Sequence, residues 1–332
     1  MVMNKIILPP PLSASGSSLA EAWENAYLKL ADNGMIYRRE DEADKGDQIA
    51  AIMDIEVRNP DLEPFSHKKG GTNAIAAPLL DYDMEILGAK DSWVRDFNDP
   101  EDKRWDYMYH ERFALYPNPK GSPIDQVEFM IQRLIERSFS RRTQMITWYP
   151  ERDTKAKDTP CLQRIWIETI PTENGDWLDM HYSFRSRNVV NASFGNMQGI
   201  YLLGCHIRDK VEEATGKNLS MRMIEKNDSY HVNSKDYPKF WDNVRHIKES
   251  RDFYNRIERE GRNPTEQEKD KYNRFFSRKE VIEILGDYRD YVESEIMRQT
   301  EKHFKGDIDK EKERVHGIGE RVFYLLNKYS GR

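Results

Sequence analysis

Apolar residues recur at helical spacing in three parts of the chain. The first stripe consists of Leu19, Ala22, Trp23, Ala26, Tyr27 and Leu30 and ends near Asn33-Gly34. This period predicts an amphipathic helix. A second stripe predicts a helix over 125–138 with Asp125 as its N-cap. A third predicts an apolar helix over 197–215 that ends at Gly216.

Alternating apolar and polar residues predict strands between these helices. The alternation covers 51–57, 144–149, 162–170, 177–186 and 219–225, and residues 172–176 have the composition of a hairpin turn. We interpret 13–18 as a small polar lead-in and 67–72 as a flexible, basic, solvated loop. This order of elements predicts an α+β fold, in which the helices 125–138 and 197–215 cover a large mixed β-sheet.

The composition changes at Pro238. Segments 239–260 and 279–299 are charged and carry apolar stripes at helical spacing, and 302–314 is a run of charge expected to face solvent on a helix. We therefore divide the chain into a domain over 1–237 and a C-terminal helical extension over 238–332. The extension is expected to pack on the same domain, and the sequence assigns it no function.

Charge and composition exclude several classes of protein. The net charge of −6 argues against a general nucleic-acid-binding surface. No run approaches the roughly 18 apolar residues of a membrane span. Two cysteines cannot form a disulfide framework, which suits a reducing cytoplasm. The eight histidines are scattered, so no metal site is expected. We expect a cytoplasmic protein that binds neither nucleic acid nor membranes.

Two short motifs are candidates for chemistry. Cys161 follows Pro160, where a charged loop gives way to the strand 162–170, and a cysteine at the start of a strand is well placed to be a nucleophile. A buried structural thiol is the alternative. Arg141 and Arg142 lie at a helix-to-strand corner, where paired guanidinium groups suit a phosphate monoester. A surface charge cluster explains them equally well.

Taken in order, the motifs resemble the thymidylate synthase superfamily, which also contains the pyrimidine nucleotide hydroxymethylases. The resemblance covers about 109–236 and rests on Tyr109, Ile124-Asp125-Gln126, Ser140-Arg141-Arg142, Trp148, Pro160-Cys161, Arg185-Ser186, Asn196 and His231. It implies that 1–237 is a catalytic domain with a thymidylate synthase-like sheet. It also implies that one face of this sheet forms a homodimer.

The resemblance implies a role for each residue of the site. Cys161 is expected to be the nucleophile, and the other catalytic residues are expected to be Glu85, Tyr109 and Asn188. Arg185 and Ser186 are expected to bind the nucleotide phosphate, with Arg141 and Arg142 reaching across the homodimer to the partner's phosphate. Asn196 corresponds to the residue that reads the pyrimidine edge, and His231 and Asn233 lie where the family contacts the sugar.

Several positions differ from the family pattern. Leu162 replaces the histidine after the cysteine, Phe184 the glutamine before Arg-Ser, Asn188 an aspartate and Asn233 a tyrosine. No arginine clearly matches the phosphate-binding arginine of the N-terminal loop, for which 67–69 are weak substitutes. The apolar C-terminal tail that closes over the folate is not evident in 329–332. These differences favour a reaction other than methylation.

The residue types and the resemblance together predict a mechanism. Addition of the Cys161 thiolate to carbon 6 of a pyrimidine makes carbon 5 nucleophilic, and Arg185 is expected to lower the pKa of the thiol. Carbon 5 then takes a one-carbon unit from 5,10-methylene-tetrahydrofolate, while Glu85 moves protons through water.

Three functions remain open on the sequence. Asn196 can both donate to and accept from uracil, so hydroxymethylation of dUMP is favoured, with dCMP as a further possible substrate. The alternatives are a thymidylate synthase proper, which methylates dUMP, and a catalytically degenerate nucleotide-binding protein.

Overall fold

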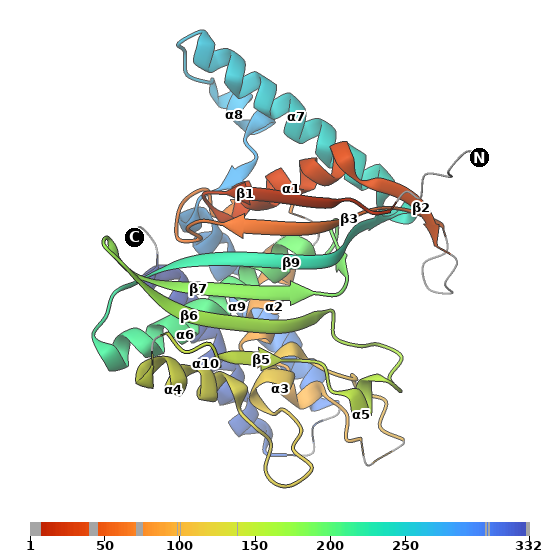
Figure 1. Ribbon diagram of the computed structural model, residues 1–332, viewed down its shortest axis with the longest axis vertical. Coiled ribbons are helices and arrows are strands. Elements are labelled where there is room, and N and C mark those ends of the chain that lie inside the picture. Colours follow the sequence, from red (N-terminus) through yellow and green to blue (C-terminus); the bar gives the residue numbers. More distant parts are fainter. Residues whose placement is uncertain are drawn as a thin grey trace, which may run out of the picture.

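The computed structural model describes residues 8–39, 46–70, 76–97, 99, 101–137, 139–302, 304 and 306–329. Its centre is a mixed sheet of eight strands with the path β1-β3-β9-β7-β6-β5, to which β2 is added beside β3 and β8 beside β9 (Figure 1). The strands are β1 Pro11–Gly16, β2 Met35–Arg39, β3 Gly46–Val57, β5 Gln144–Ile146, β6 Leu162–Thr172, β7 Gly175–Phe184, β8 Arg187–Asn188 and β9 Leu219–Asn233. The α+β fold with a large mixed sheet is confirmed.

The pairing of β6, β7, β8 and β9 decides which residues meet. β6 and β7 form an antiparallel hairpin in which Leu162 pairs with Phe184 at the open end. β9 runs parallel to β7, and β8 pairs with β9 so that Asn188 lies opposite His231. The start of β6, the end of β7 and the second half of β9 therefore meet at one end of the sheet.

The helices begin and end at residues suited to those positions. Helix α1 (Leu19–Asn33) is capped by the side chain of Ser18. Helix α4 (Gln126–Glu136) is capped by Asp125, as predicted. Helix α6 (Ser193–Thr215) ends at Gly216, which has φ +68°. The other helices described before residue 237 are α2 Ala76–Ile86, α3 Tyr109–Ala114, α5 Pro150–Asp153 and the 3₁₀ turns η2 Asp91–Trp93 and η3 Ser234–Asp236.

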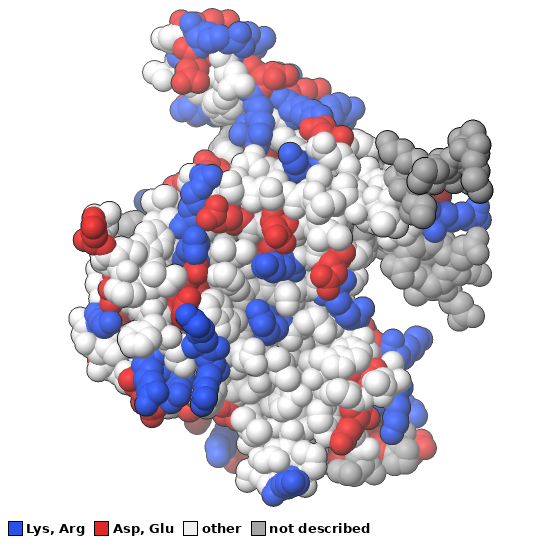
Figure 2. All heavy atoms as spheres, viewed as in Figure 1, with Lys and Arg blue, Asp and Glu red and all other residues white. Residues whose placement is uncertain are grey.

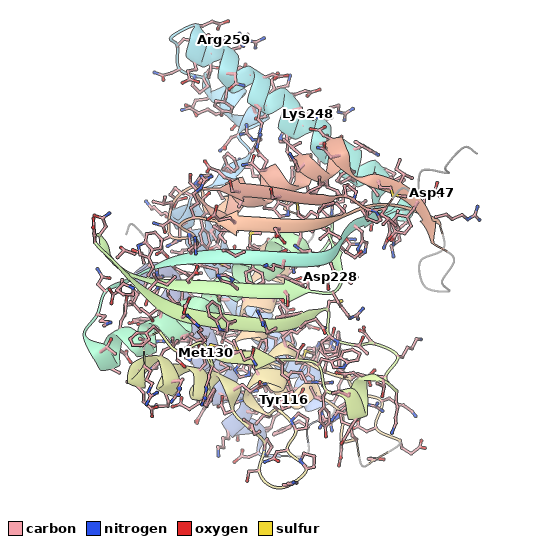
Figure 3. All side chains as sticks on the ribbon, viewed as in Figure 1. Asp47, Tyr116, Met130, Asp228, Lys248 and Arg259 are labelled. Carbon is pink, nitrogen blue, oxygen red and sulfur yellow. The ribbon has the colours of Figure 1, made fainter. Side chains whose placement is uncertain are left out.

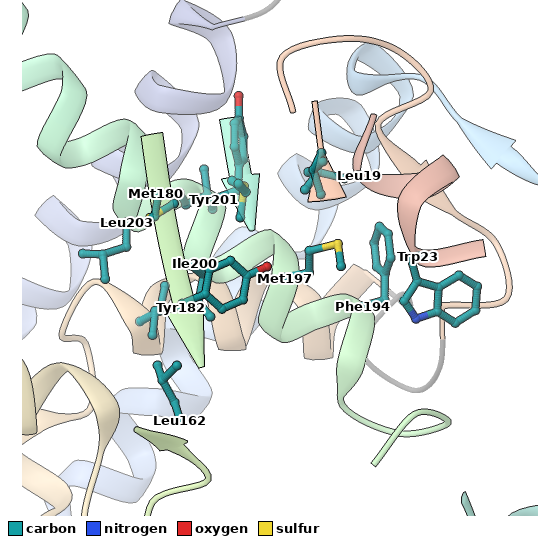
Figure 4. Packing of buried hydrophobic residues seen from close by; sticks show 14 of the residues in the cluster. Leu19, Trp23, Leu162, Met180, Tyr182, Phe194, Met197, Ile200, Tyr201 and Leu203 are labelled. Atoms are coloured by element: carbon teal, nitrogen blue, oxygen red, sulfur yellow. The ribbon is translucent and has the colours of Figure 1, made fainter. Parts of the chain in front are cut away.

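Helices cover one face of the sheet. Figure 1 shows α2, α6, α9 and α10 behind the strands, and Figure 4 shows the core around Trp23, Phe194, Met197 and Ile200. The Nε1 of Trp23 donates to the hydroxyl of Ser193 at 2.7 Å, which joins α1 to the first turn of α6. In Figure 2 the opposite face of the sheet is open to the viewer, with charged side chains scattered among uncharged ones.

The C-terminal segments contact the rest of the chain in several places. They are α7 Tyr237–Arg259, α8 Glu266–Tyr272, β10 Phe275–Phe276, α9 Arg278–Glu301 and α10 Ile308–Lys328. The outer part of α7 projects from the body together with α8, and Lys248 and Arg259 lie along α7 in Figure 3. Helices α9 and α10 pack on α2, and α10 also packs on α6. The domain boundary near residue 237 stays a prediction.

A buried carboxylate ties the C-terminal segments to α1. Glu24 on α1 accepts hydrogen bonds from His67 at 2.8 Å, Arg251 at 2.5 Å and Arg274 at 2.7 Å. Although burial alone would raise the pKa of Glu24, His67 and the two arginines lower it to about 2. His67 lies in β4 (Ser66–His67), which pairs with β10.

Several sequence-based predictions of local structure were wrong. His67 is fully buried, so 67–72 is not a solvated loop as far as it is described, and Gly71 and Thr72 lie outside the described residues. The lead-in 13–18 is largely a strand, because β1 pairs in parallel with β3. The strand predicted over 144–149 ends at Ile146. The strand predicted over 219–225 continues to Asn233.

The described residues include neither a membrane-spanning helix nor a metal-binding cluster. None of the helices in these ranges is long and apolar enough to cross a membrane. The same residues contain no group of three His, Cys, Asp or Glu side chains that could hold a metal ion.

Candidate active site

Cys161 lies directly before β6 and is half-buried. The backbone N–H of Arg185, which follows β7, donates to the carbonyl oxygen of Cys161 at 2.9 Å. The Arg185 side chain lies along the same loop, since its Nε donates to Pro160 O at 3.0 Å and its Nη2 to Thr159 O at 2.8 Å. Arg185 therefore braces the loop that carries the thiol. Ser186, the next residue, is partly exposed.

The side chain of Tyr109, the first residue of α3, lies next to the loop that carries Cys161. The hydroxyl of this buried tyrosine accepts a hydrogen bond from the N–H of Leu162 at 3.3 Å, one residue beyond Cys161. Burial raises the pKa of Tyr109, and the negative charge of a Cys161 thiolate would raise it further. Tyr109 is thus a neutral hydroxyl beside the thiol at neutral pH.

Glu85 lies on the last turn of α2 and interacts electrostatically with Tyr109. Its Oε2 is 3.0 Å from the Nζ of Lys90. Burial raises the pKa of Glu85, and the charge of Lys90 opposes this rise. A carboxyl group with a raised pKa is suited to proton transfer near neutral pH.

Arg187 is a buried cation next to Asn196. Its Nη1 donates to Asn196 Oδ1 at 2.7 Å, and its Nη2 donates to Ser193 O at 2.9 Å and to Glu225 Oε2 at 3.1 Å. Its guanidinium carbon lies 3.8 Å from the ring centroid of Phe184. Phe184, one of the differences from the family pattern, thus provides an aromatic face for Arg187. The first turn of α6 is fixed to β7, β8 and β9 by these contacts.

His231 and Asn188 lie opposite each other in β9 and β8. The Nδ1 of His231 is 3.2 Å from the hydroxyl of Ser229. The Oδ1 of Asn188 accepts from the N–H groups of Val190 and Asn191, both at 3.0 Å, and its Nδ2 donates to Asp236 at 3.2 Å. Asn188 is therefore held by the turn that leads into α6.

Asn233 lies two residues beyond His231 at the end of β9, and its Oδ1 accepts a hydrogen bond from Gln48 on β3. It is buried, as is His231.

Arg141 and Arg142 lie apart from these residues. Both are exposed in the turn between α4 and β5, and neither guanidinium forms a hydrogen bond or ion pair with another described residue. Because Gln144 pairs with Trp166, the two arginines lie alongside the middle of β6. The arginines precede Gln144, so at about 3.3 Å per strand residue they lie more than about 16 Å from Cys161 along β6.

The protonation of Cys161 differs from the sequence-based expectation. Burial raises the pKa of the thiol above its ordinary value, and this effect outweighs the opposing charges of Arg185 and Arg187. The predicted lowering of this pKa is therefore wrong for the protein without a bound nucleotide.

Two residues near the thiol were missed from the sequence. Arg187 and the partly buried Tyr107 both interact electrostatically with Cys161 or its neighbour Tyr109. The only signal for Arg187 was a second arginine close after Arg185, where an alternating strand ends. Tyr107 has the same two-residue spacing from Tyr109, and their ring centroids are 5.6 Å apart.

Comparison with known proteins connects this geometry to a family. A "Putative thymidylate synthase" of Methanopyrus kandleri is 26% identical over 201 residues, which are 60% of this chain and 85% of the relative. The protein of the same description in Methanosarcina barkeri is 24% identical over 232 residues, 69% of this chain and 91% of the relative. That of Methanocaldococcus jannaschii is 28% identical over 201 residues, 58% of this chain and 80% of the relative.

The chain shows distant homology to these putative thymidylate synthases, which supports a relation to the thymidylate synthase superfamily. No protein-family model matches it, which agrees with the low identities. The resemblance found in the motifs is thus confirmed at the level of the superfamily. The shared segment extends well beyond the 109–236 region that the motifs cover, since the longest of these three matches includes 232 residues.

We predict that the two thiols differ in reactivity toward iodoacetamide. Cys161 is half-buried with a pKa raised by burial, so its alkylation rate should keep rising with pH beyond its ordinary pKa of 9.0. Cys205 is fully buried and burial raises its pKa to about 11, so it should stay unmodified in the native protein. Mass spectrometry of peptides from a pH series measures both rates.

Arg185→Ala should slow alkylation of Cys161 near neutral pH, because the positive charge of Arg185 lowers the pKa of the thiol. Half-maximal alkylation well below pH 9 in the unliganded wild-type protein would contradict the dominance of burial.

Proposed function

We propose that the protein transfers a one-carbon unit from 5,10-methylene-tetrahydrofolate to carbon 5 of a pyrimidine nucleoside monophosphate, through a covalent bond to Cys161. The preferred reaction is hydroxymethylation of dUMP. The observation that carries the proposal is the meeting of Cys161, Tyr109, Arg185 and the Arg187–Asn196 pair at one end of the sheet. The distant homology to putative thymidylate synthases supports the assignment of this chemistry to the site.

Each of these residues has a task in the proposed reaction. Cys161 adds to carbon 6, which places negative charge on the carbonyl oxygen at carbon 4 and makes carbon 5 nucleophilic. Arg185 binds the phosphate together with Ser186. Glu85 removes the proton of carbon 5 through water, and Tyr109 holds the peptide N–H next to Cys161. His231 and Asn233 contact the sugar, and Asn188 holds the turn between Arg187 and Asn196.

The Arg187–Asn196 contact supports uracil as the base. A guanidinium has donors only, so it fixes the carbonyl oxygen of the Asn196 amide toward Arg187. The amide N–H₂, which also interacts with the buried hydroxyl of Tyr82, is then the group that can face a base. It can donate to the carbonyl at carbon 4 of uracil, whereas the amino group at carbon 4 of cytosine is itself a donor. The buried charge of Arg187 also favours negative charge that develops at this carbonyl.

The described end of α10 is anchored far from Cys161. Tyr329 is buried and its hydroxyl donates to Glu212 at 3.2 Å, while Glu212 accepts from Leu219 N at 2.8 Å. Leu219 pairs with the first part of β7, whereas Cys161 lies beside the end of β7, about 30 Å away at strand spacing. The preference for hydroxymethylation rests on the positions that differ from the family pattern, among them Leu162 and Phe184. Addition of water gives a hydroxymethyl group, whereas a methyl group requires a hydride.

A pocket beside α2 fits the rings of the one-carbon donor. It has a volume of about 530 Å³, within the range of small-molecule sites. Trp93, Trp105 and Tyr291 provide aromatic surface, and Lys103 provides a cation for a carboxylate tail. When bound, the donor supplies the one-carbon unit at the oxidation level of formaldehyde. Because Lys90 both lines the pocket and contacts Glu85, the pocket adjoins the proposed proton-transfer group.

We also propose a homodimer across the open face of the sheet. Ile52, Ile146 and Trp166 lie at least partly exposed on strands β3, β5 and β6, which suits burial against a second copy of the chain. Arg141 and Arg142 are exposed at the same edge and more than about 16 Å from their own Cys161. They would then bind the phosphate in the partner's site.

Thymidylate synthase proper is the second candidate. The descriptions of the archaeal relatives favour it, since each is described as a "Putative thymidylate synthase". It differs from the first candidate only in the last step, where a hydride from the reduced folate replaces water.

The nucleotide product distinguishes the candidates. We predict that protein incubated with dUMP and 5,10-methylene-tetrahydrofolate yields a nucleotide heavier by one hydroxymethyl group in place of hydrogen, without formation of dihydrofolate. Mass spectrometry of the nucleotide and absorbance of the folate measure the two outcomes. A methylated nucleotide with dihydrofolate would establish the second candidate.

Cys161→Ala should abolish both the product and the release of tritium from carbon 5 of labelled dUMP, because no thiolate can add to carbon 6. Cys205→Ala is the matched control and should retain activity if it folds, since Cys205 lies in the core of α6. Wild-type protein that binds dUMP but releases no tritium would be the catalytically degenerate alternative.

We predict that Trp105→Ala and Tyr291→Ala each weaken binding of the folate by roughly three- to tenfold, because aromatic contacts contribute about 0.5–1.5 kcal/mol. Calorimetric titration with tetrahydrofolate measures this directly, without turnover. Tyr288→Ala is the control: Tyr288 is 43% exposed on the same helix as the 63% exposed Tyr291, but it does not line the pocket. Equal affinities in all four proteins would remove the pocket from the proposal.

A further inference from the structure

The segment directly after α2 carries the cation that contacts Glu85. Gly88 turns the chain with φ +101°, a conformation that favours glycine. Two residues later, Lys90 is buried, and its Nζ lies 2.6 Å from Asp81 and 3.0 Å from Glu85. A lysine side chain is long and flexible, so a fixed contact of this kind requires that its backbone and stem be held in place.

Helix α10 holds the backbone of this segment. Arg314 donates from Nη1 to Gly88 O at 2.6 Å and from Nη2 to Ala89 O at 3.3 Å. The same arginine is paired with Glu311, which accepts a hydrogen bond from the hydroxyl of Ser92 at 3.0 Å. The carbonyl oxygens of Gly88 and Ala89 and the side chain of Ser92 are therefore bound to one helical turn of α10.

Helix α9 fixes the aromatic ring that the ammonium group of Lys90 contacts. The Nε1 of Trp93 donates to the hydroxyl of Thr300 on α9 at 2.8 Å. This fixes the indole, whose ring lies 5.0 Å from the Nζ of Lys90. A cation over an indole face is stabilised when it is desolvated. The run 302–314, expected to face solvent, thus includes two residues that contact the centre of the protein.

We propose that α9 and α10 are part of the catalytic centre, because they position Lys90 against Glu85 through Arg314, Glu311 and Thr300. This inference rests on the proposed function, in which Glu85 moves the proton of carbon 5. Lys90 is then a positioning residue. The C-terminal extension, to which the sequence assigned no function, sets how readily Glu85 gains and loses its proton.

Glu85 has charged and titratable neighbours from several elements. Asp81 on α2 and Asp91 in η2 raise its pKa, as burial does, and Lys90 is the cation that lowers it. Tyr82 on α2 and Tyr109 on α3 are also close enough to interact with it.

The elements packed around Glu85 bring further charges nearby. Asp91 is paired with His110 of α3 at 2.7 Å and interacts with Arg314 of α10. On α9, Glu295 lines the pocket that Lys90 also lines. Although burial lowers the pKa of Lys90, Glu85 and Asp81 outweigh this effect, so Lys90 stays protonated. Loss of Lys90 would remove the cation that lowers the pKa of Glu85, so this pKa would rise.

The test is the pH dependence of tritium release from carbon 5 of labelled dUMP, with both substrates saturating. If Glu85 acts as a base, the rate rises with pH as Glu85 ionises. Lys90→Gln should move this rise upward by about one pH unit, the effect of losing an opposite charge in contact. Arg314→Ala should move it in the same direction by less, because it loosens Lys90 without removing it.

Arg321→Ala is the matched control. Arg321 is also on α10 and pairs with a carboxylate, Asp209 on α6, at 2.5 Å, but it does not contact the segment after α2. It should leave the pH profile unchanged even if it lowers the melting temperature. A wild-type profile for both Lys90→Gln and Arg314→Ala would overturn this inference and leave the proposed function standing. No tritium release from wild-type protein would overturn both.

Discussion

Helix α6 is buried along most of its 23 residues, between the sheet on one side and α2, α4 and α10 on the other. A helix in this position must satisfy its polar side chains inside the protein. Arg208 does so through Asp61, with hydrogen bonds of 2.7 and 2.9 Å, and Asn196 through Arg187. These contacts fix the position of α6 relative to the strands. The first turn of α6 and the ends of β7 and β9 therefore form a rigid frame for the candidate site.

The thiol at the edge of this frame is subject to opposing effects. Burial favours the neutral thiol, and the guanidinium groups of Arg185 and Arg187 favour the thiolate. Burial is the stronger effect, so the neutral thiol is favoured in the protein without a nucleotide. Arg187 differs from Arg185 in that its charge is already paired with Glu225. Its main effect is on the orientation of Asn196, and Arg185 is the cation more open to a phosphate.

Predictions that depend on residues close together in the sequence were mostly right, and those that depend on contacts between distant residues failed. Helices α1 and α4 and the hairpin β6–β7 were predicted, because period, caps and turn residues are local signals. Strand β1 was missed because its small residues carry no pattern, and only pairing with β3 makes it a strand. His67 was taken for a loop residue because nothing near it in sequence indicates Glu24, 43 positions away.

In the candidate site, too, the motifs were visible in the sequence but the long-range contacts were not. The order of the motifs was enough to choose Cys161, Tyr109, Arg185 and Asn196, which meet at one end of the sheet. The contact of Arg187 with Glu225 and that of Arg314 with Gly88 join residues far apart in the chain, so their spacing gave no sign of them. For the same reason the charged run 302–314 looked like a solvated surface. The departures from the family pattern were visible in the sequence, but the contact between Phe184 and Arg187 was not.

The central claim is that Cys161 forms a covalent bond to the pyrimidine ring during one-carbon transfer. The most direct test is the intact mass of the protein after incubation with 5-fluoro-dUMP and 5,10-methylene-tetrahydrofolate. Fluorine at carbon 5 cannot leave as a cation, so the reaction should stop while the nucleotide is still bonded to the protein. We predict a mass increase equal to nucleotide plus donor that is absent in Cys161→Ala. An unchanged wild-type mass, or an increase that persists in Cys161→Ala, would contradict the account.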